Sequence, residues 1–403
     1  MSSSTRLSRT AAVSALLLAS VAVAACGGQD GGTSKTESGG KGKGQGKPAP
    51  ARVDDPLVAT YDGGLYVLDG KTLKVAGDVP LKGYNRVNPA GDDRHVMVST
   101  SQGFRVLDAG RPGLTDIAFK GAEPGHVVLH AGKTVLFTDG TGETRIFDPD
   151  DLGRTGGKPE TETYKAPSPH HGVSVELENG ELVTTLGTAK KRKGIAVLDG
   201  KRKEITRNEK CPEVHGEAAA EDEAVVIGCE DGVLIYKDKK ITKVDSPTEY
   251  GRIGNQKGSE KSPVVLGDYK QDPEAELERP EKVSLINTRT GKMKLLDLGT
   301  SYSFRSLARG PQGEAMVLGT DGKIHVIDPE KGEVTRKISA VDSWREPLDW
   351  QQARPEIFVR GTTAYVTEPE KKKIHAIDLK SGKKTATGTV EKKPNEIAAT
   401  VRG

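Results

Sequence analysis

The sequence repeats one short motif eight times, and this repetition limits the folds that the chain can adopt. In each copy an apolar, strand-like run ends in Asp, or in two copies in Lys or Asn. Successive copies are 38 to 51 residues apart, about 44 on average. The final residues of the copies are Asp69, Asp108, Asp148, Asp199, Lys237, Asn287, Asp328 and Asp378. Around each motif the sequence has room for four short antiparallel strands and their turns, which is the size of a β-propeller blade.

The two ends of the repeat region predict how the ring of blades closes. Seven blades read as complete between about residues 84 and 391. For the eighth, residues 394–400 would supply the innermost strand and residues 57–81 the other three, which removes an open sheet edge. We therefore predict an all-β, eight-bladed propeller over residues 54–403, with the last blade closed by N- and C-terminal strands. The alternative fold, two β-sandwiches in tandem, would not produce one sequence period along the whole chain.

The composition excludes several other classes of protein. The chain is 34% hydrophobic and 4% aromatic, with 49 glycines and a mean hydropathy of −0.53, which excludes a polytopic membrane protein and a helical bundle. Seven of the 60 basic and two of the 57 acidic residues precede residue 54, so the remainder is close to neutral. No concentrated basic block occurs there, which argues against nucleic-acid binding.

The first 53 residues are predicted to be a targeting signal followed by a flexible tether. Two arginines precede an uncharged, mostly apolar run that ends at Ala25, and Cys26 follows. This order resembles a bacterial lipoprotein signal peptide over residues 1–25, with Cys26 lipidated and anchoring the chain to the outer face of the cell membrane. The alternative is a secreted protein cut nearby. Residues 26–53 are rich in Gly, Lys and Ser, which predicts a disordered linker.

Histidines fall at the same step of three consecutive blades. The starts of the innermost strands align as Gly125-His126, His170-His171-Gly172 and Val214-His215-Gly216. Imidazoles that converge from rigid strands suit a tetrahedral zinc ion, and three of them leave one position open. The alternative is that each histidine simply packs or hydrogen-bonds at its strand start. The sequence does not decide whether His170 or His171 points inward.

Other candidate ligands lie nearby. Glu217 is a candidate fourth ligand, because residues two apart on a strand share a side and it follows His215 at that interval. Glu123 and Glu213 are further candidates in the preceding loops, and His130 would be deeper, at a second site. The remaining histidines of the propeller, which we interpret as ordinary strand residues, are His95, His325 and His375.

Two cysteines follow Cys26. Cys211 lies in the loop entering the fifth blade and Cys229 ends the second strand of that blade. In an oxidising compartment we expect them to form a disulfide, which would contribute roughly 3 kcal/mol and stiffen the loop before His215. The alternative is that both are thiolate metal ligands.

An acidic insertion enlarges a turn of the sixth blade. Residues 268–280 contain five carboxylates and connect its second and third strands. The insertion would serve as a mobile lid that collects cations or meets a partner, or it is a solvated segment without a role.

Motifs typical of catalysis are missing from the sequence. It contains no Gly-x-Ser-x-Gly elbow, no His-Glu-x-x-His helix, and no cofactor loop of the Rossmann or Walker kind. We therefore predict that the protein is not an enzyme.

These features together resemble those of the AztD zinc-metallochaperone family over roughly residues 54–403. The segments that carry the resemblance are Pro124-Gly125-His126-Val127-Val128, Pro169-His170-His171-Gly172-Val173 and Cys211-Pro212-Glu213-Val214-His215-Gly216-Glu217. The resemblance implies an extracytoplasmic propeller that binds a zinc ion and delivers it to the substrate-binding protein of a zinc ABC transporter.

The leading hypothesis is thus a monomeric zinc carrier that meets the membrane only through its lipid anchor and binds no nucleic acid. The chain departs from this expectation in one respect. A zinc donor is expected to carry a mobile segment with a metal ligand, but the linker contains no histidine. The insertion over residues 268–278 or the open coordination position would take that role. A propeller used purely to bind a protein or cell-wall partner is the alternative, and a propeller hydrolase or lactonase is a third reading.

Overall fold

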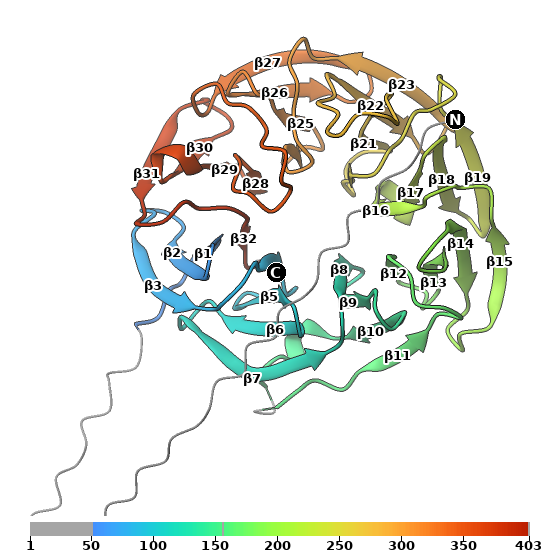
Figure 1. The fold of residues 1–403 in the computed structure, drawn as a ribbon, viewed down its shortest axis with the longest axis horizontal. Coiled ribbons are helices and arrows are strands. Elements are labelled where there is room, and N and C mark those ends of the chain that lie inside the picture. Colours follow the sequence, from blue (N-terminus) through green and yellow to red (C-terminus); the bar gives the residue numbers. More distant parts are fainter. Residues whose placement is uncertain (1–50, 155–156, 402–403) are drawn as a thin grey trace, which may run out of the picture. The chain divides into compact units, whose positions relative to one another are not determined.

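The structure is a computed structural model that describes residues 51–154 and 157–401. Within these residues, 32 strands form eight four-stranded antiparallel sheets arranged in a ring (Figure 1). The eight-bladed propeller predicted from the repeat is therefore confirmed. The predicted signal peptide (1–25), Cys26 and most of the predicted linker lie outside the described residues.

Each blade runs from an innermost strand at the central channel to an outer strand at the rim, and we number the blades 1 to 8 in ring order. The innermost strands are β32 (Ile397–Ala399), β4 (Arg86–Pro89), β8 (Pro124–His130), β12 (Ser174–Glu176), β16 (His215–Ala219), β20 (Gln256–Lys257), β24 (Leu307–Arg309) and β28 (Ile357–Arg360). The second strands are β1 (Pro56–Tyr61), β5 (His95–Thr100), β9 (Lys133–Thr138), β13 (Leu182–Gly187), β17 (Val225–Cys229), β21 (Val264–Asp268), β25 (Ala315–Leu318) and β29 (Thr363–Glu368).

The outer half of each blade contains the strand that carries the repeated motif. The third strands are β2 (Gly64–Asp69), β6 (Gly103–Asp108), β10 (Glu143–Phe147), β14 (Arg192–Leu198), β18 (Gly232–Lys237), β22 (Lys282–Asn287), β26 (Lys323–Asp328) and β30 (Lys373–Asp378). The outer strands are β3 (Val75–Pro80), β7 (Gly113–Lys120), β11 (Glu162–Lys165), β15 (Glu204–Asn208), β19 (Lys240–Asp245), β23 (Lys292–Asp297), β27 (Glu333–Ser339) and β31 (Lys384–Thr389). Three short 3₁₀ turns complete the described elements: η1 (Pro149–Asp151), η2 (Glu221–Glu223) and η3 (Pro369–Lys371).

Blade 1 joins the two ends of the ring. Strand β32 pairs antiparallel with β1, with Leu57 opposite Ala399. Beyond the strand, Thr60 accepts a backbone hydrogen bond from Asn395 at 2.7 Å. This is the closure predicted from the sequence, and it gives the inner edge of β1 a partner strand. Val53, at the end of the predicted linker, is buried and packs with the propeller.

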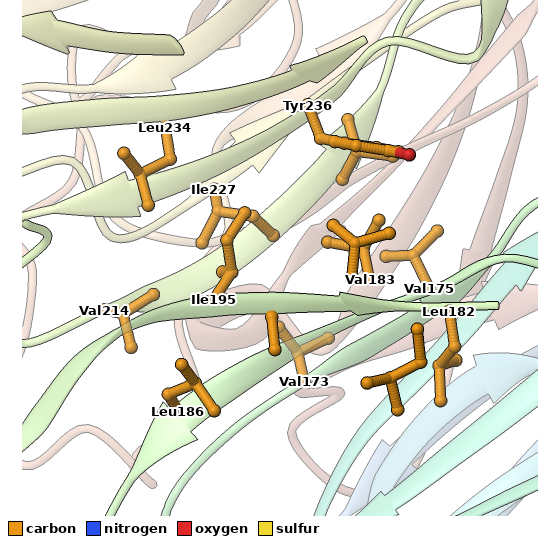
Figure 2. Close-up of a cluster of buried hydrophobic side chains, with 14 of the residues drawn as sticks. Val173, Val175, Leu182, Val183, Leu186, Ile195, Val214, Ile227, Leu234 and Tyr236 are labelled. Atoms are coloured by element: carbon orange, nitrogen blue, oxygen red, sulfur yellow. The ribbon is translucent and has the colours of Figure 1, made fainter. Parts of the chain in front are cut away.

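The hydrophobic core lies between neighbouring blades. The second and third strands are buried along nearly their whole length, whereas outer strands such as β19 alternate between exposed and partly buried residues. Figure 2 shows one such cluster, in which Val183 of β13 and Ile195 of β14 lie near Ile227 and Tyr236 of the next blade. Stacked sheets that bury both faces need strands that are apolar on both sides, which is why the motif reads as a continuous apolar run.

The repeated Asp has a local structural role. Asp69 Oδ1 accepts hydrogen bonds from the backbone N–H and the hydroxyl of Thr72, both at 2.7 Å. Asp378 accepts in the same way from Ser381, and Asn287 accepts from the backbone of Thr290. The side chain thus caps the turn after the third strand, which explains why the motif ends in Asp or Asn in most blades. In the described part of the chain, no helix has the length and hydrophobicity needed to span a membrane.

Candidate metal centre

Three histidines from adjacent blades meet at the channel. His126 lies within β8 of blade 3, His171 lies three residues before β12 of blade 4, and His215 begins β16 of blade 5. Their ring centroids are 5.7, 5.7 and 4.9 Å apart. One ring nitrogen from each lies within 4.8 Å of the other two. The geometry therefore brings together three of the candidate ligands that the sequence aligned.

His170 is not part of this group. It is 2% exposed, and its Nε2 and Nδ1 lie 2.9 Å from the Thr185 hydroxyl and the Ser168 carbonyl, respectively. Both ring nitrogens are used inside the blade, and burial lowers the pKa of His170. The structure thus separates the pair: His171 belongs to the histidine group, and His170 is a buried hydrogen-bonding residue.

Each clustered ring is held at the nitrogen Nδ1. Glu217 Oε2 lies 3.1 Å from Nδ1 of His126, and the Gly254 carbonyl lies 2.5 Å from Nδ1 of His215. Asp139 Oδ2 contacts Nδ1 of His171. A carbonyl or carboxylate only accepts, so Nδ1 carries the proton and the Nε2 lone pair is available in the neutral ring. Among the described residues, none makes a hydrogen bond to these three Nε2 atoms.

The prediction that Glu217 is a fourth ligand is not supported by its position. A β-bulge between His215 and Glu217 shifts the register against β17, so the two side chains do not share a side as a regular strand would require. Gly216 makes the bulge possible with a φ of +70°, where a Cβ would lie 2.5 Å from the Gly254 carbonyl. Glu217 instead supports the His126 ring from two blades away.

The two other acidic candidates are also outside the group. Glu213 forms an ion pair with Arg192. Burial acts to raise the pKa of Glu213, but the ion pair outweighs burial and lowers this pKa. Glu123 lines the channel but is not among the clustered ligands. His130 pairs with Glu223 at 2.9 Å and likewise is not one of the three.

The remaining histidines occupy structural positions. Each has a ring nitrogen near an acidic residue of its own blade: His95 with Asp92, His325 with Asp321 and His375 with Glu368. All three rings are buried in second or third strands, as expected for ordinary strand residues.

Sequence reasoning missed the residues that support the rings. Asp139 lies in the turn after β9, between the second and third strands. Gly254 is fixed by Asp268, whose Oδ1 accepts from the Gly254 N–H at 2.7 Å. The place of these residues in the blade could have identified them. The turn between the second and third strands opens on the same face as the start of the innermost strand. Asp139 and Asp268 both occupy that turn or its edge.

The rings have different proton affinities. Burial lowers the pKa of His215 well below its usual range, and the neighbouring His126 and His171 lower it further. Burial also opposes protonation of His126, but the charge and hydrogen bond of Glu217 outweigh it and raise the pKa. At neutral pH the imidazole of His215 is therefore neutral, the form that can bind a metal without first losing a proton.

A disulfide joins Cys211 to Cys229, with the two Cα atoms 5.0 Å apart. Both residues are fully buried, so the alternative of two thiolate ligands is wrong. Residue 228, next to Cys229, is paired with His215 across β16 and β17. The bridge thus ties the entrance of blade 5 to the strand that positions His215.

The acidic insertion is anchored in the structure. Asp268 is 2% exposed and holds Gly254 and Asn255, so it is not a surface carboxylate. Glu278 accepts hydrogen bonds from the backbone N–H groups of Gln271 and Asp272. The exposed carboxylates of the insertion are Asp272, Glu274 and Glu276.

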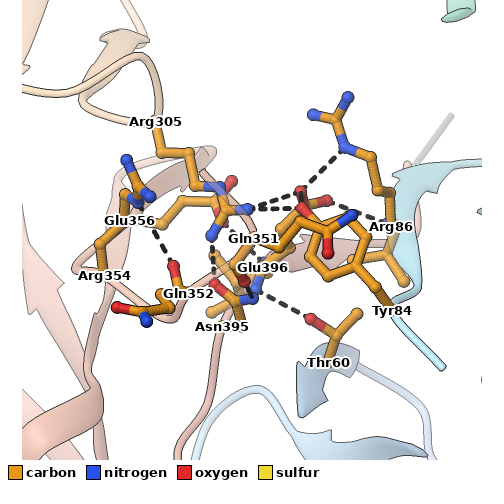
Figure 3. A network of polar contacts seen from close by, with 12 residues as sticks. Thr60, Tyr84, Arg86, Arg305, Gln351, Gln352, Arg354, Glu356, Asn395 and Glu396 are labelled. Carbon is orange, nitrogen blue, oxygen red and sulfur yellow. Dashed lines mark hydrogen bonds and ion pairs between the residues drawn. The ribbon is translucent and has the colours of Figure 1, made fainter. Parts of the chain in front are cut away.

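A cavity of about 1060 Å³ opens at the channel beside the three histidines. Across the ring from blade 4, its wall includes Glu356 and Glu396 of blades 8 and 1. Figure 3 shows that Glu396 accepts hydrogen bonds from Tyr84, Arg86 and Arg305 at 2.8 to 3.1 Å. One half of the cavity thus offers nitrogen ligands, and the other half is a network of paired charges.

The nitrogen donors fit zinc in type and spacing. Zinc binds imidazole nitrogen at about 2.0–2.1 Å in tetrahedral sites, which places two such nitrogens about 3.4 Å apart. In this structure the corresponding nitrogens lie within 4.8 Å of one another. A tetrahedral ion held by three protein nitrogens would have a fourth position free for another ligand.

Comparisons with known proteins bear on the sequence and the fold. No family model matches the chain. The zinc chaperone AztD of Citrobacter koseri is 27% identical over 303 residues, which are 73% of this chain and 69% of that protein. Two structures of Citrobacter koseri AztD, one of them apo, are 23% identical and cover 86% of this chain and 96% of theirs, with TM-scores of 0.72 and 0.73. The chain is thus similar to AztD in sequence and shares its propeller fold, which confirms the resemblance to the AztD zinc-metallochaperone family.

Proposed function

We propose that this protein is an extracytoplasmic, non-catalytic zinc chaperone that delivers zinc to the substrate-binding protein of a zinc ABC transporter. Zinc would bind through Nε2 of His126, His171 and His215. The proposal combines the similarity to the zinc chaperone AztD with the chemistry of the three rings.

The observation that carries the proposal is the anchoring of all three rings at Nδ1. Histidine ligands of metals almost always donate the other ring N–H to a carboxylate or a backbone carbonyl. Here Asp139, Glu217 and the Gly254 carbonyl supply the three acceptors. Histidines that only packed at strand starts would have no reason to converge and also to have a hydrogen-bond acceptor at every Nδ1.

Release of zinc would use the open fourth position. A ligand of the acceptor protein would bind there first, and the histidines would then be exchanged one by one. The side chain of His171 is 45% exposed and that of His126 is 22% exposed. We therefore infer that His171 is the first histidine to be replaced. This route needs no histidine in the tether.

The location of the protein follows from its N-terminus. We infer that residues 1–25 are removed, that Cys26 is lipidated and that residues 26–53 link the anchor to the propeller at 54–403. The mature protein would be a monomer on the outer face of the cell membrane, attached only through its lipid.

Calorimetric zinc titration tests the proposal. The variant His126→Ala/His171→Ala/His215→Ala should lose stoichiometric high-affinity binding, because no described ligand group remains to replace three nitrogens. The matched control is His130→Asn, which changes a histidine outside the group and should bind zinc as the unchanged protein does. Equal affinity of the triple variant and the unchanged protein would refute the proposed function.

A further inference from the structure

The segment that connects β27 to β28 exposes two large apolar side chains. Residues 340–356 connect blade 7 to blade 8. Within this segment Leu348 is 59% exposed and Trp350 is 52% exposed, and these are the two most exposed large apolar residues of the described chain. Trp is among the residues most often found at the energetic centre of protein interfaces.

The segment is held rigidly from within. Arg354 is 1% exposed, and its guanidinium pairs with the buried carboxylate of Glu346 at 2.5 Å. The same guanidinium donates to the Asp349 carbonyl at 2.6 Å. It also donates to the Gln352 carbonyl at 3.4 Å, a contact drawn in Figure 3. A buried ion pair is costly to form, yet here it fixes the backbone on both sides of Trp350. The exposed side chains are thus presented on a preorganised support.

Trp350 belongs to the mouth of the histidine cavity. Its indole and the ring of Tyr84 meet edge to face, with centroids 5.2 Å apart. Both residues line the cavity that also contains the three histidines. Trp350 thus lies in the connection between blades 7 and 8 and contacts the connection that enters blade 2.

Unpaired carboxylates lie on a segment attached to this support. Arg279, at the end of the acidic insertion, donates to the Glu346 carbonyl at 2.9 Å and so joins the insertion to the segment. The exposed residues Asp272, Glu274 and Glu276 form no ion pair with any described residue. The segment that carries the two apolar side chains is therefore joined to an insertion that carries three exposed carboxylates.

We propose that Leu348, Trp350 and the three exposed carboxylates form the docking surface for the protein that accepts zinc. The inference rests on the proposed function. The occupant is a protein surface with an apolar centre and a basic border, because exposed apolar side chains favour a protein partner and unpaired carboxylates favour Lys or Arg. A partner seated on Trp350 reaches over the cavity toward the open coordination position.

Binding measurements with metal-free proteins test this surface. The probe is the zinc-free substrate-binding protein of the bacterium's own zinc ABC transporter, titrated against the full chain. The variant Leu348→Ser/Trp350→Ser should raise the Kd by at least about tenfold, as expected when anchors of an interface are truncated. The matched control Val75→Ser/Ile205→Ser removes two exposed apolar side chains from the outer strands β3 and β15, and should leave the Kd within about twofold.

The charge border has its own test. Asp272→Asn/Glu274→Gln/Glu276→Gln should slow association and reduce its dependence on salt, because charges at an interface rim act mainly on the association rate. An unchanged Kd for the Leu348→Ser/Trp350→Ser variant would overturn the docking surface, as would the absence of any complex with the unchanged chain. Zinc titration of the same variants keeps the two proposals separate. Normal zinc affinity with weakened docking supports both. Normal zinc affinity with unchanged docking overturns only the docking surface, whereas absence of zinc binding by the unchanged chain refutes the proposed function and with it the role of this surface in zinc transfer.

Discussion

The carboxylate of Glu217 lies 3.1 Å from Nδ1 of His126, although the two residues belong to innermost strands two blades apart. The contact crosses the position of blade 4, whose own histidine completes the group. Each ring is thus oriented by an atom from a different part of the chain: His126 by blade 5, His171 by a turn of blade 3, and His215 by the loop entering blade 6. The geometry of the group therefore depends on the packing of blades 3 to 6 against one another.

Removal of the Glu217 carboxylate should weaken zinc binding without abolishing it. We expect Glu217→Ala to lower zinc affinity by about 10- to 100-fold, the usual effect of losing a partner of a metal-binding histidine. Glu217→Gln should lose less, because its amide oxygen still accepts from Nδ1. Isothermal titration of both variants checks this. Equal losses in the two variants would indicate that Glu217 binds the metal directly.

Zinc affinity should fall as the pH decreases. Burial lowers the pKa of His126, but Glu217 outweighs burial and raises it, so a proton competes with zinc at Nε2 below this raised pKa. Glu217→Gln removes the charge, which should lower the pKa of His126 and move the loss of zinc affinity to lower pH. Zinc titrations between about pH 5 and 8 measure the midpoint in both proteins. The same midpoint in both would contradict this assignment.

The disulfide should stabilise the fold and the ring of His215 together. Cys211→Ser/Cys229→Ser opens a loop with a sequence separation of 18 residues, which should cost roughly 3 kcal/mol of unfolding free energy. Because the bridge braces the entrance to β16, zinc affinity should also decrease. Denaturant unfolding and zinc titration of the double variant provide the two measurements. A variant with reduced stability and full zinc affinity would show that the bridge does not position His215.

Glu356 should make the protein less stable as the pH rises. Burial raises its pKa to about 8, and the nearby carboxylate of Glu396 adds to the rise. The folded state thus favours the protonated acid, so this contribution is complete below the unfolded pKa of about 4.3 and is lost as the pH rises through about 8. Glu356→Gln stays neutral, and at pH 9 it should unfold with a free energy at least about 1 kcal/mol above that of the unchanged protein.

Denaturant unfolding at about pH 5 and 9 tests this difference, which should nearly vanish at the lower pH. Glu396→Gln is the matched control in the same network. Glu396 bonds to Arg86 and Arg305, and its pKa is lowered by these cations despite its burial. Its replacement should destabilise the protein at both pH values, because it removes the carboxylate that pairs with the buried Arg305. An equal gain in stability from Glu356→Gln at both pH values would contradict the inference that Glu356 loses its proton near pH 8 in the folded state.

The sequence by itself determined the architecture, because every blade has the same local pattern. Apolar strands such as the one ending at Asp69 recur with their capping turns, and those short-range signals set both the number of blades and the closure by residues 394–400. The same register also placed His126 and His215 at equivalent strand starts. A repeated trace carries equivalent residues to equivalent points around the channel.

Only the tertiary structure decided which side chains meet there. Adjacent residues such as His170 and His171 differ in direction according to the local backbone, and the bulge at Gly216 turns Glu217 away from its expected side. The contacts of Asp139 and Gly254 join segments 32 and 39 residues apart from the histidines that they hold. Such contacts depend on the distances between packed blades, which no local pattern encodes.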